Sequence, residues 1–367
     1  MKKLFFSIVM LATASFTIQA QSVFYVDNNA GSPVNNPQNN YNSVQAAVDA
    51  ASAGDIIYIE PSPNGYGDIQ MTKKLTIYGI GHNPELNAGK RATVSNILFR
   101  YGNASGSKIS GLNIVGIYLD NTTYTNNDVI IFNNQIVRIF GISQTGHADS
   151  IIIMGNFFYN NSGPAIGVGQ GQDWVISYNL VQQNGNSWSY YSFEYFNDTT
   201  ILDNNIILSR QTGDANQDIR LFYNCSDALI QNNIFIFTST SIDNFTNITG
   251  NSALRFNNNL TYSVTTTLDP LGGTNNIDNT NPMFTAFDPN SALNNYNNND
   301  FTFQAGSPAI GAGSDTKDLG VINGSYPFSM RGYPTELPYL RDFVINNNIL
   351  SAGTDLDINI KADANNN

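Results

Sequence analysis

One acidic residue of this sequence lies in an aromatic neighbourhood that could do chemistry. Glu194 is the only Glu between positions 86 and 335. Aromatic rings can stack on the faces of a sugar, and a carboxyl group beside a bound sugar can act as a general acid or base. The alternative is an exposed strand residue next to ordinary β-forming aromatics. The tyrosines of this cluster are Tyr190, Tyr191 and Tyr195.

Basic residues nearby could complete a binding or catalytic site. Arg220 could neutralise a carboxylate of a ligand, or it could pair with Asp218 or Glu194 on the surface. His147 could serve as a base, although a single histidine in a turn is more commonly just solvated. Two further residues in turns are candidates for ligand contacts: Arg138 and Asp173.

A repeated phrase indicates how these residues are positioned. A short aliphatic run, an Asn and a second apolar pair recur from about residue 108, at intervals of 21 to 28 residues. Coils of three short strands fit this length, whereas propeller blades need about 40 residues and leucine-rich repeats need a Leu framework. The repeated residues are Asn113, Asn134, Asn156, Asn179, Asn205, Asn233 and Asn259.

The repeat predicts an all-β fold, a parallel β-helix whose coils stack about 4.8 Å apart. Each repeated Asn is expected at a tight bend, in the left-handed conformation that costs Asn less than other side chains. Stacked copies are expected to form a ladder of amide hydrogen bonds along the solenoid. These Asn residues are therefore predicted to be structural and not part of a ligand site.

Both ends of a solenoid need caps, because its terminal coils expose apolar surface and strand edges. Residues 43–52 predict a short amphipathic helix that caps the start of a domain spanning residues 21–330. Residues 331–367 contain two alternating strands, 341–350 and 355–361, which predict a C-terminal β-hairpin cap. A docking or sorting tail is the alternative for this segment.

The composition excludes some partners. The formal net charge is −12, and about 55 residues are Asn. Such an acidic chain without a basic stripe would repel phosphate backbones, so nucleic acid is not an expected partner.

The first 20 residues predict a signal peptide. Lys2 and Lys3 precede an apolar run, and the small Ala20 precedes the expected cleavage point. Later segments are too short or too polar to predict a membrane span. The chain is therefore expected to be exported, to the periplasm, the cell surface or the medium.

Two stretches near the ends are typical of one family. The first comprises residues 25–27, the 43–52 helix and Ala53-Gly-Asp-Ile-Ile-Tyr-Ile-Glu-Pro61; the second comprises residues 303–313 with Asp318-Leu-Gly320. They resemble the opening and closing segments of secreted pectin-lyase-like proteins, and the resemblance covers about residues 23–320. It implies a right-handed parallel β-helix. It implies no single activity, because that superfamily includes lyases, hydrolases, esterases, epimerases and non-catalytic proteins.

Two functions follow as hypotheses. The first is an exported β-helix that binds a polysaccharide or cell-surface glycan, or serves as a surface scaffold. The second is a polysaccharide lyase or glycoside hydrolase that uses Glu194 and Arg220, with calcium as an added requirement if it is a lyase. No cofactor is predicted otherwise. The first hypothesis is favoured, because the residues of the solenoid are well specified and a dense catalytic cluster is not. The paired-Asp and Gly-His-Gly signatures of polygalacturonases are also missing from the sequence.

Overall fold

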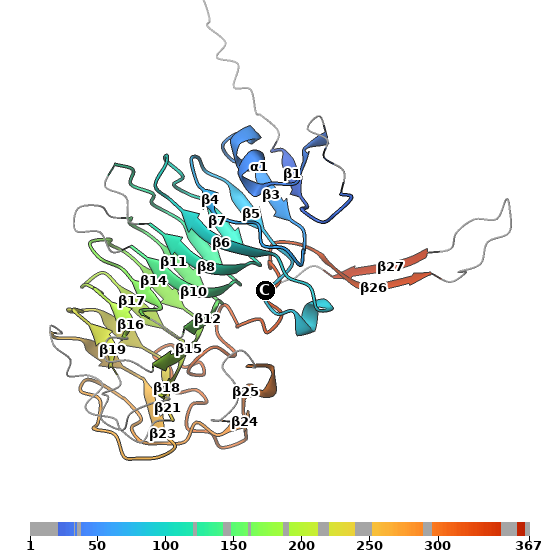
Figure 1. The fold of residues 1–367 in the computed structure, drawn as a ribbon. Coiled ribbons are helices and arrows are strands. Elements are labelled where there is room, and N and C mark those ends of the chain that lie inside the picture. The colour runs from blue at the N-terminus through green and yellow to red at the C-terminus, as the bar shows by residue number, and fades with distance from the viewer. Residues whose placement is uncertain are drawn as a thin grey trace, which may run out of the picture.

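The chain winds into an all-β solenoid whose neighbouring coils pair in parallel (Figure 1). The predicted parallel β-helix is therefore confirmed. The computed structural model describes residues 21–32, 34, 38–119, 123–141, 148–160, 163–185, 191–211, 220–238, 252–288, 296–345 and 358–363.

One long sheet, called sheet A, forms one wall of the solenoid. In its central strands the middle residue points into the core, as Ile131 and Ile153 do, and the residues on either side point outward. In spatial order its strands are β2 (Asn40–Tyr41), β1 (Val23–Val26), β3 (Ile56–Ile59), β5 (Thr76–Tyr78), β7 (Lys108–Ser110), β9 (Ile130–Phe132), β11 (Ile152–Met154), β14 (Val175–Ser177), β17 (Ile201–Asp203), β20 (Leu229–Gln231) and β22 (Arg255–Asn257).

A second sheet begins as one wall and then divides into two branches. Strands β4 (Ile69–Gln70), β6 (Thr93–Leu98), β8 (Asn113–Tyr118) and β10 (Gln135–Phe140) form the undivided part. The first half of β10 pairs with β12 and the second half with β13. The β12 branch comprises β12 (Phe157–Asn160), β15 (Leu180–Gly185), β18 (Ile206–Gln211), β21 (Ile234–Phe237) and β23 (Leu260–Ser263). The β13 branch comprises β13 (Ile166–Gly167), β16 (Tyr191–Glu194) and β19 (Arg220–Tyr223).

The predicted Asn ladder is present at the corner between sheet A and the β12 branch. The Oδ1 atom of Asn156 accepts hydrogen bonds from the backbone nitrogen (3.0 Å) and the Nδ2 atom (3.2 Å) of Asn134, one coil earlier. Asn134 Nδ2 also donates to two backbone carbonyls, so the buried amide is fully engaged. The same pattern repeats through Asn179, Asn205, Asn233 and Asn259, and it extends to Asn276.

Two parts of the ladder prediction are wrong. The left-handed residue is not the ladder Asn but the residue before it, for example Tyr178 with φ +55°. Asn113 also lies outside the ladder, because Leu112 donates its backbone nitrogen to Asn134 Oδ1 while Asn113 pairs with Gln135 on the next strand. The ladder therefore begins at Asn134, whose Oδ1 atom accepts a hydrogen bond from the backbone nitrogen of an aliphatic residue, Leu112.

The outer face of the β12 branch is closed by the chain's own C-terminal part. Its apolar side chains line up in register and are buried against residues from positions 284–328. This second apolar core covers the outer face of the β12 branch with protein. The strand side chains are Phe157, Leu180, Ile206, Ile234 and Leu260, and those that cover them include Phe284, Phe301, Leu319, Val321 and Phe328.

The segment after residue 309 runs back along the ladder corner and ties the coils together. Ser314 N donates to Asn232 Oδ1 at 2.8 Å, and Ser325 N donates to Tyr178 Oη at 3.0 Å, two coils earlier. Gly324 permits this close approach, since a Cβ atom there would lie 2.0 Å from the Tyr178 ring. An ion pair between Lys108 and Glu336 (2.5 Å) fixes the end of the segment beside β7.

The ends of the chain differ in how they meet the solenoid. The predicted N-terminal cap is helix α1 (Val44–Ala50), which buries Val44, Ala47 and Val48. The predicted hairpin forms from β26 (Tyr339–Ile345) and β27 (Ile358–Asp363), but Figure 1 shows it projecting from the side of the solenoid. The short antiparallel pair β24 (Phe284–Ala286) and β25 (Asp300–Phe303) lies beside the last coils instead.

We expect Asn179→Ala to lower the free energy of unfolding by about 3 kcal/mol, because it leaves the buried backbone N–H of Asn156 without an acceptor. Chemical denaturation measures this loss. Asn64→Ala, at an exposed Asn, is the control and should change stability by less than about 0.5 kcal/mol. Equal effects of the two variants would show that the ladder does not stabilise the fold.

Candidate functional site

A single register column crosses the outer face of the undivided sheet and continues onto the β13 branch. Its members face one another directly on successive strands, about 4.8 Å apart. Gly167 contributes no side chain, so the column is interrupted next to Glu194. The column, called the Glu194 column below, consists of Tyr118, Phe140, Gly167, Glu194 and Tyr223.

Aromatic rings surround the carboxyl group of the Glu194 column. Tyr191 and Tyr223 stack with ring centroids 4.2 Å apart and planes 15° apart. Tyr195 meets Tyr223 edge-on at 6.1 Å. Glu194 is only partly exposed between these strands, and burial raises the pKa of its carboxyl group to about 6. A carboxyl group with this pKa holds or releases a proton near neutral pH, which is the property that acid–base chemistry requires.

Two arginines provide positive charge at the other end of the column. The guanidinium carbon of Arg100 lies 4.8 Å from the Tyr118 ring centroid, and that of Arg138 lies 5.6 Å from the Phe140 ring centroid. The two rings stack on each other with centroids 5.7 Å apart. Both arginines thus lie over aromatic rings, with their charge next to the column.

The structure brings together only part of the predicted site. Glu194, Tyr191 and Tyr195 do cluster, and Arg138 lies two strands and two residues away on the same face, with its backbone about 12 Å from that of Glu194. Asp173 does not join them. It is exposed at the turn before β14, where its backbone nitrogen donates to Thr199 Oγ1 at 2.8 Å.

Of the three remaining predicted site residues, the structure describes one, Arg220. Arg220 lies on β19, opposite Tyr191, and is three residues away from the position that faces Glu194. Its backbone thus lies about 10 Å along the strand from that position. Tyr190 and His147 fall outside the described residues.

Four members of the site were missed by sequence reasoning: Tyr118, Phe140, Tyr223 and Arg100. A signal exists for the three aromatic residues, because strands β8, β10 and β19 each end with an aromatic residue at the position that Glu194 occupies in β16. The unequal loops between β10, β13 and β16 hide this register in the sequence.

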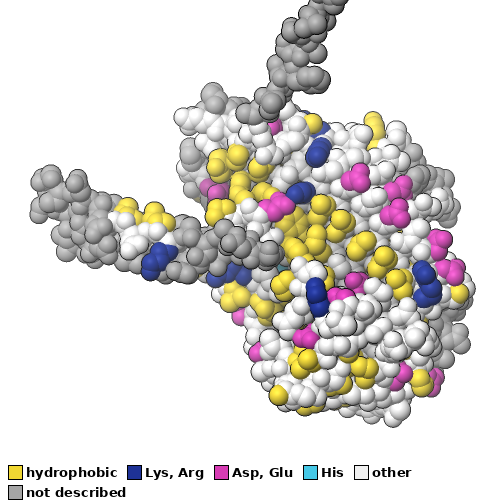
Figure 2. All heavy atoms as spheres, turned by 180° about the vertical axis from the view of Figure 1, so that it is seen from behind, with side chains coloured by type: hydrophobic (Ala, Val, Ile, Leu, Met, Phe, Trp, Pro, Cys, Tyr) yellow, Lys and Arg dark blue, Asp and Glu magenta, His cyan; other side chains and the backbone are white. Residues whose placement is uncertain are grey.

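The outer face of sheet A is open and has a different character. Figure 2 shows apolar side chains spread across this face, with acidic side chains beside them. The aliphatic residues occupy one register column of half-exposed side chains: Ile130, Ile152, Val175, Ile201 and Leu229. Near its N-terminal end Tyr25, Tyr58 and Tyr78 stack in register, and burial raises the pKa of Asp203 on β17. That carboxyl group lies five strands from the nearest of these rings, whereas the Glu194 column places rings and carboxyl group side by side.

Among the described residues, neither the cysteine nor a metal-binding cluster provides a second reactive group. Cys225 is buried, and burial raises the pKa of its thiol to about 12, so it is a poor nucleophile. In the part of the chain that the structure describes, no three His, Cys, Asp or Glu side chains come together to hold a metal ion. The described residues also include no helix of the length and apolar character that a bilayer crossing requires.

No protein-family model matches this chain, and no curated protein matches it either. The function proposed for the protein therefore depends on the geometry of the Glu194 column.

We expect the Glu194 carboxyl group to titrate with a pKa of about 6, above its ordinary value of 4.5, in a carbon-13 NMR titration. Because the folded state binds this proton more tightly, the stabilisation is complete below pH 4.5 and is lost as the pH rises through about 6. Glu194→Gln should abolish this part of the pH dependence, whereas Glu85→Gln, at an exposed Glu, should retain it. A titration at the ordinary value would contradict the burial of Glu194.

Proposed function

We propose that this protein is exported and binds a polysaccharide or cell-surface glycan along the Glu194 column. The observation that carries the proposal is the common register of Tyr118, Phe140, Glu194 and Tyr223, interrupted only by Gly167 on the strand between Phe140 and Glu194. A linear chain of sugars can follow such a column, because its ring faces and hydroxyls then meet apolar rings and a carboxyl group in turn.

Two further features support this surface over the others. The outer face of the β12 branch is covered by the chain's own C-terminal part, and sheet A carries its stacked tyrosines at least five strands away from Asp203, its carboxyl group of raised pKa. Arg138 and Arg100 add positive charge beside the column, in a protein whose net charge is −12. This arrangement suits a glycan that carries some carboxylate groups.

The resemblance to secreted pectin-lyase-like proteins agrees with this proposal at the level of architecture. Export follows from the predicted signal peptide at residues 1–20. The solenoid positions the column on a rigid wall, as a binding surface for an extended ligand requires.

Binding to a panel of soluble polysaccharides, measured by affinity gel electrophoresis, tests the proposal. We expect Tyr223→Ala to weaken binding about tenfold, because it removes the ring that packs against Tyr191 and next to Glu194. Tyr25→Ala is the matched control, since Tyr25 is 46% exposed on β1 and lies outside the column. Equal retardation of both variants and the parent protein would overturn the assignment of this surface.

Acid–base catalysis by Glu194 is a second candidate, favoured by its raised pKa. In a lyase or glycoside hydrolase of this kind, Glu194 would take or give the proton and Arg138 would attract a sugar carboxylate.

We expect any turnover of uronate polysaccharides, followed by absorbance of unsaturated products or by reducing ends, to fall at least about 100-fold in Glu194→Gln. Calcium is included because an eliminating enzyme uses a cation to neutralise the sugar carboxylate. The Glu85→Gln variant should keep the parent rate. Turnover that survives in Glu194→Gln would exclude this candidate without affecting the binding proposal.

A further inference from the structure

The aliphatic column of sheet A has carboxyl groups along one border. Asp128, Asp173 and Asp227 each lie two residues before a member of this column, at the turn that leads into its strand. Their strands are β9, β14 and β20, which alternate with β11 and β17, so successive backbone positions are about 10 Å apart. These three residues are called the Asp row below. Figure 2 shows acidic side chains following the edge of the apolar patch on this face.

Backbone geometry does not require acidic side chains at these turns. Asp128 and Asp173 have φ +59° and Asp227 has φ +55°, a left-handed conformation that Asn adopts as readily as Asp. The turns would thus form equally well without the charge of the Asp row. The corner before the Asn ladder has the same conformation and carries amides instead. Its left-handed residues include Asn133, Asn204, Asn232 and Asn258.

The described part of the chain offsets the charge of the Asp row only at one end. All three carboxyl groups belong to exposed residues, and none forms an ion pair with a residue that the structure describes. Arg255 stands at one end of the column, where it donates to the backbone carbonyls of Asp227 at 2.9 Å and Asp198 at 3.3 Å. Its charge therefore acts on the Asp227 end of the row more than on the Asp128 end.

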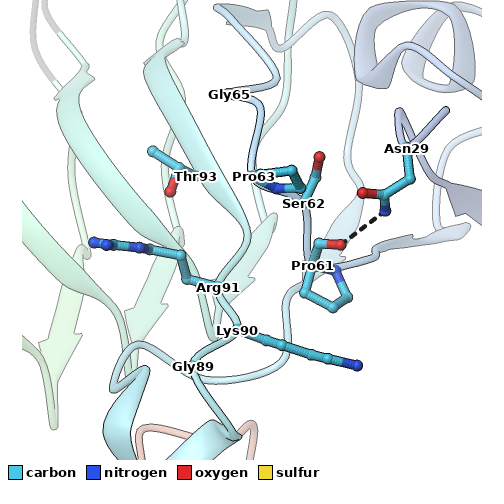
Figure 3. Close-up of a pocket in the computed structure, with 9 residues that line it drawn as sticks. All are labelled: Asn29, Pro61, Ser62, Pro63, Gly65, Gly89, Lys90, Arg91 and Thr93. Atoms are coloured by element: carbon cyan, nitrogen blue, oxygen red, sulfur yellow. Dashed lines mark hydrogen bonds between the residues drawn. The ribbon is translucent and has the colours of Figure 1, made fainter.

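Other exposed cations lie on a different wall of the solenoid. Lys90 and Arg91 precede β6 in the second sheet, beside a hollow between residues 61–65 and 89–93. Figure 3 shows the two side chains extending to opposite sides of this hollow. These cations therefore belong to a different surface from the Asp row.

The returning C-terminal part forms the opposite border of the aliphatic column. Asn133 Nδ2 donates to Tyr333 O at 3.0 Å, and Ser325 N donates to Tyr178 Oη at 3.0 Å. Between this border and the Asp row, β9 and its neighbours leave a floor about 13 Å wide, which is the reach of the strand from position 128 to position 132. One α-helix, about 10–12 Å across with its side chains, fits this width.

An extended peptide cannot add a strand to this face. The strands that carry the column are each paired on both sides, so their backbone N–H and C=O groups are already used. An α-helix needs no such groups, because its own backbone is hydrogen-bonded internally. From β9 to β20 the column runs for about 19 Å, the length of an α-helix of about 13 residues. Two helical turns rise about 11 Å, close to the spacing of the Asp row.

We propose that this face of sheet A docks a basic amphipathic α-helix of a protein partner. The apolar stripe of the helix packs on the aliphatic column, and Lys or Arg residues seven positions apart pair with Asp128, Asp173 and Asp227. A second copy of this chain is a poorer occupant, because two Asp rows would approach each other in a chain of net charge −12. The proposal is independent of glycan binding, since this face shares no residue with the Glu194 column.

Fluorescence anisotropy with labelled peptides tests the proposal on the whole protein. The probe is a helical peptide of about 15 residues made of Leu, Lys and Ala, with its leucines on one face and its lysines seven positions apart beside them. One comparison peptide replaces each Lys by Glu, and another has the same composition in an order that destroys the apolar face. We expect the probe to bind, and both comparison peptides to bind at least about tenfold more weakly at about 0.15 M salt.

The Asp row is tested by removing charge while the turns are kept. Asp128→Asn with Asp173→Asn should weaken probe binding about tenfold, because Asn retains the left-handed backbone and loses the charge. Asp49→Asn with Asp269→Asn is the matched control, which removes the same charge from exposed positions on α1 and after β23. It should bind the probe within about twofold of the parent protein.

The aliphatic column is tested in the same way. Ile152→Thr with Ile201→Thr keeps the β-branched shape of each side chain and places hydroxyl groups on the column, which should weaken probe binding about tenfold. Ile310→Thr with Ile358→Thr is the matched control, at positions that are 49% and 40% exposed outside the column. Circular dichroism of all the variants checks that the fold is retained.

Three results with the peptides would overturn the proposal. They are no detectable binding of the probe, equal affinity for the probe and either comparison peptide, and equal losses in the variants of this face and their controls. A dimer that dissociates in Ile152→Thr with Ile201→Thr would also contradict it, because that result would assign the face to a second copy of the chain.

Discussion

The fold depends on how the polar groups at one buried corner are satisfied. Each turn from sheet A into the β12 branch buries backbone N–H and C=O groups that no strand partner can reach. The ladder amide solves this problem, since Asn179 Oδ1 accepts two hydrogen bonds from Asn156 while Asn179 Nδ2 donates to Ile153 O and Ser177 O. A side chain that lacks either a donor or an acceptor could not satisfy these backbone groups, so most other residue types would destabilise the corner.

The ladder also fixes the register of everything beyond the corner. Because each coil is held to the next at one point, the side chains that follow fall into columns. One column packs the β12 branch against the returning C-terminal part, and another aligns Glu194 with Tyr223 and Phe140. The binding surface that we propose is therefore a consequence of the stacking and requires no long loops to build it.

Much of the architecture could be predicted from the sequence, because the period of the Asn phrases is visible without a structure. The error at Asn113 arose because Leu112 occupies the ladder position in the first coil, so the nearest Asn is one residue out of register. The covered face could not be predicted either. Strand β21 (Ile234–Phe237) is apolar on both faces, and only the return of the C-terminal part explains its outward side chains. The grouping of Tyr191 and Tyr195 with Glu194 was predicted from the sequence. The position of Tyr223 beside Glu194 became visible only from the register of β16 and β19.

Amide hydrogen exchange of the protein, resolved by NMR, tests the role of the ladder most directly. If the ladder closes the corner, the backbone amides of Asn134, Asn156, Asn179 and Asn205 exchange only when the whole solenoid unfolds, because each donates to a buried Oδ1 atom. Exchange of these amides as fast as that of the exposed residues in the turns would contradict the account.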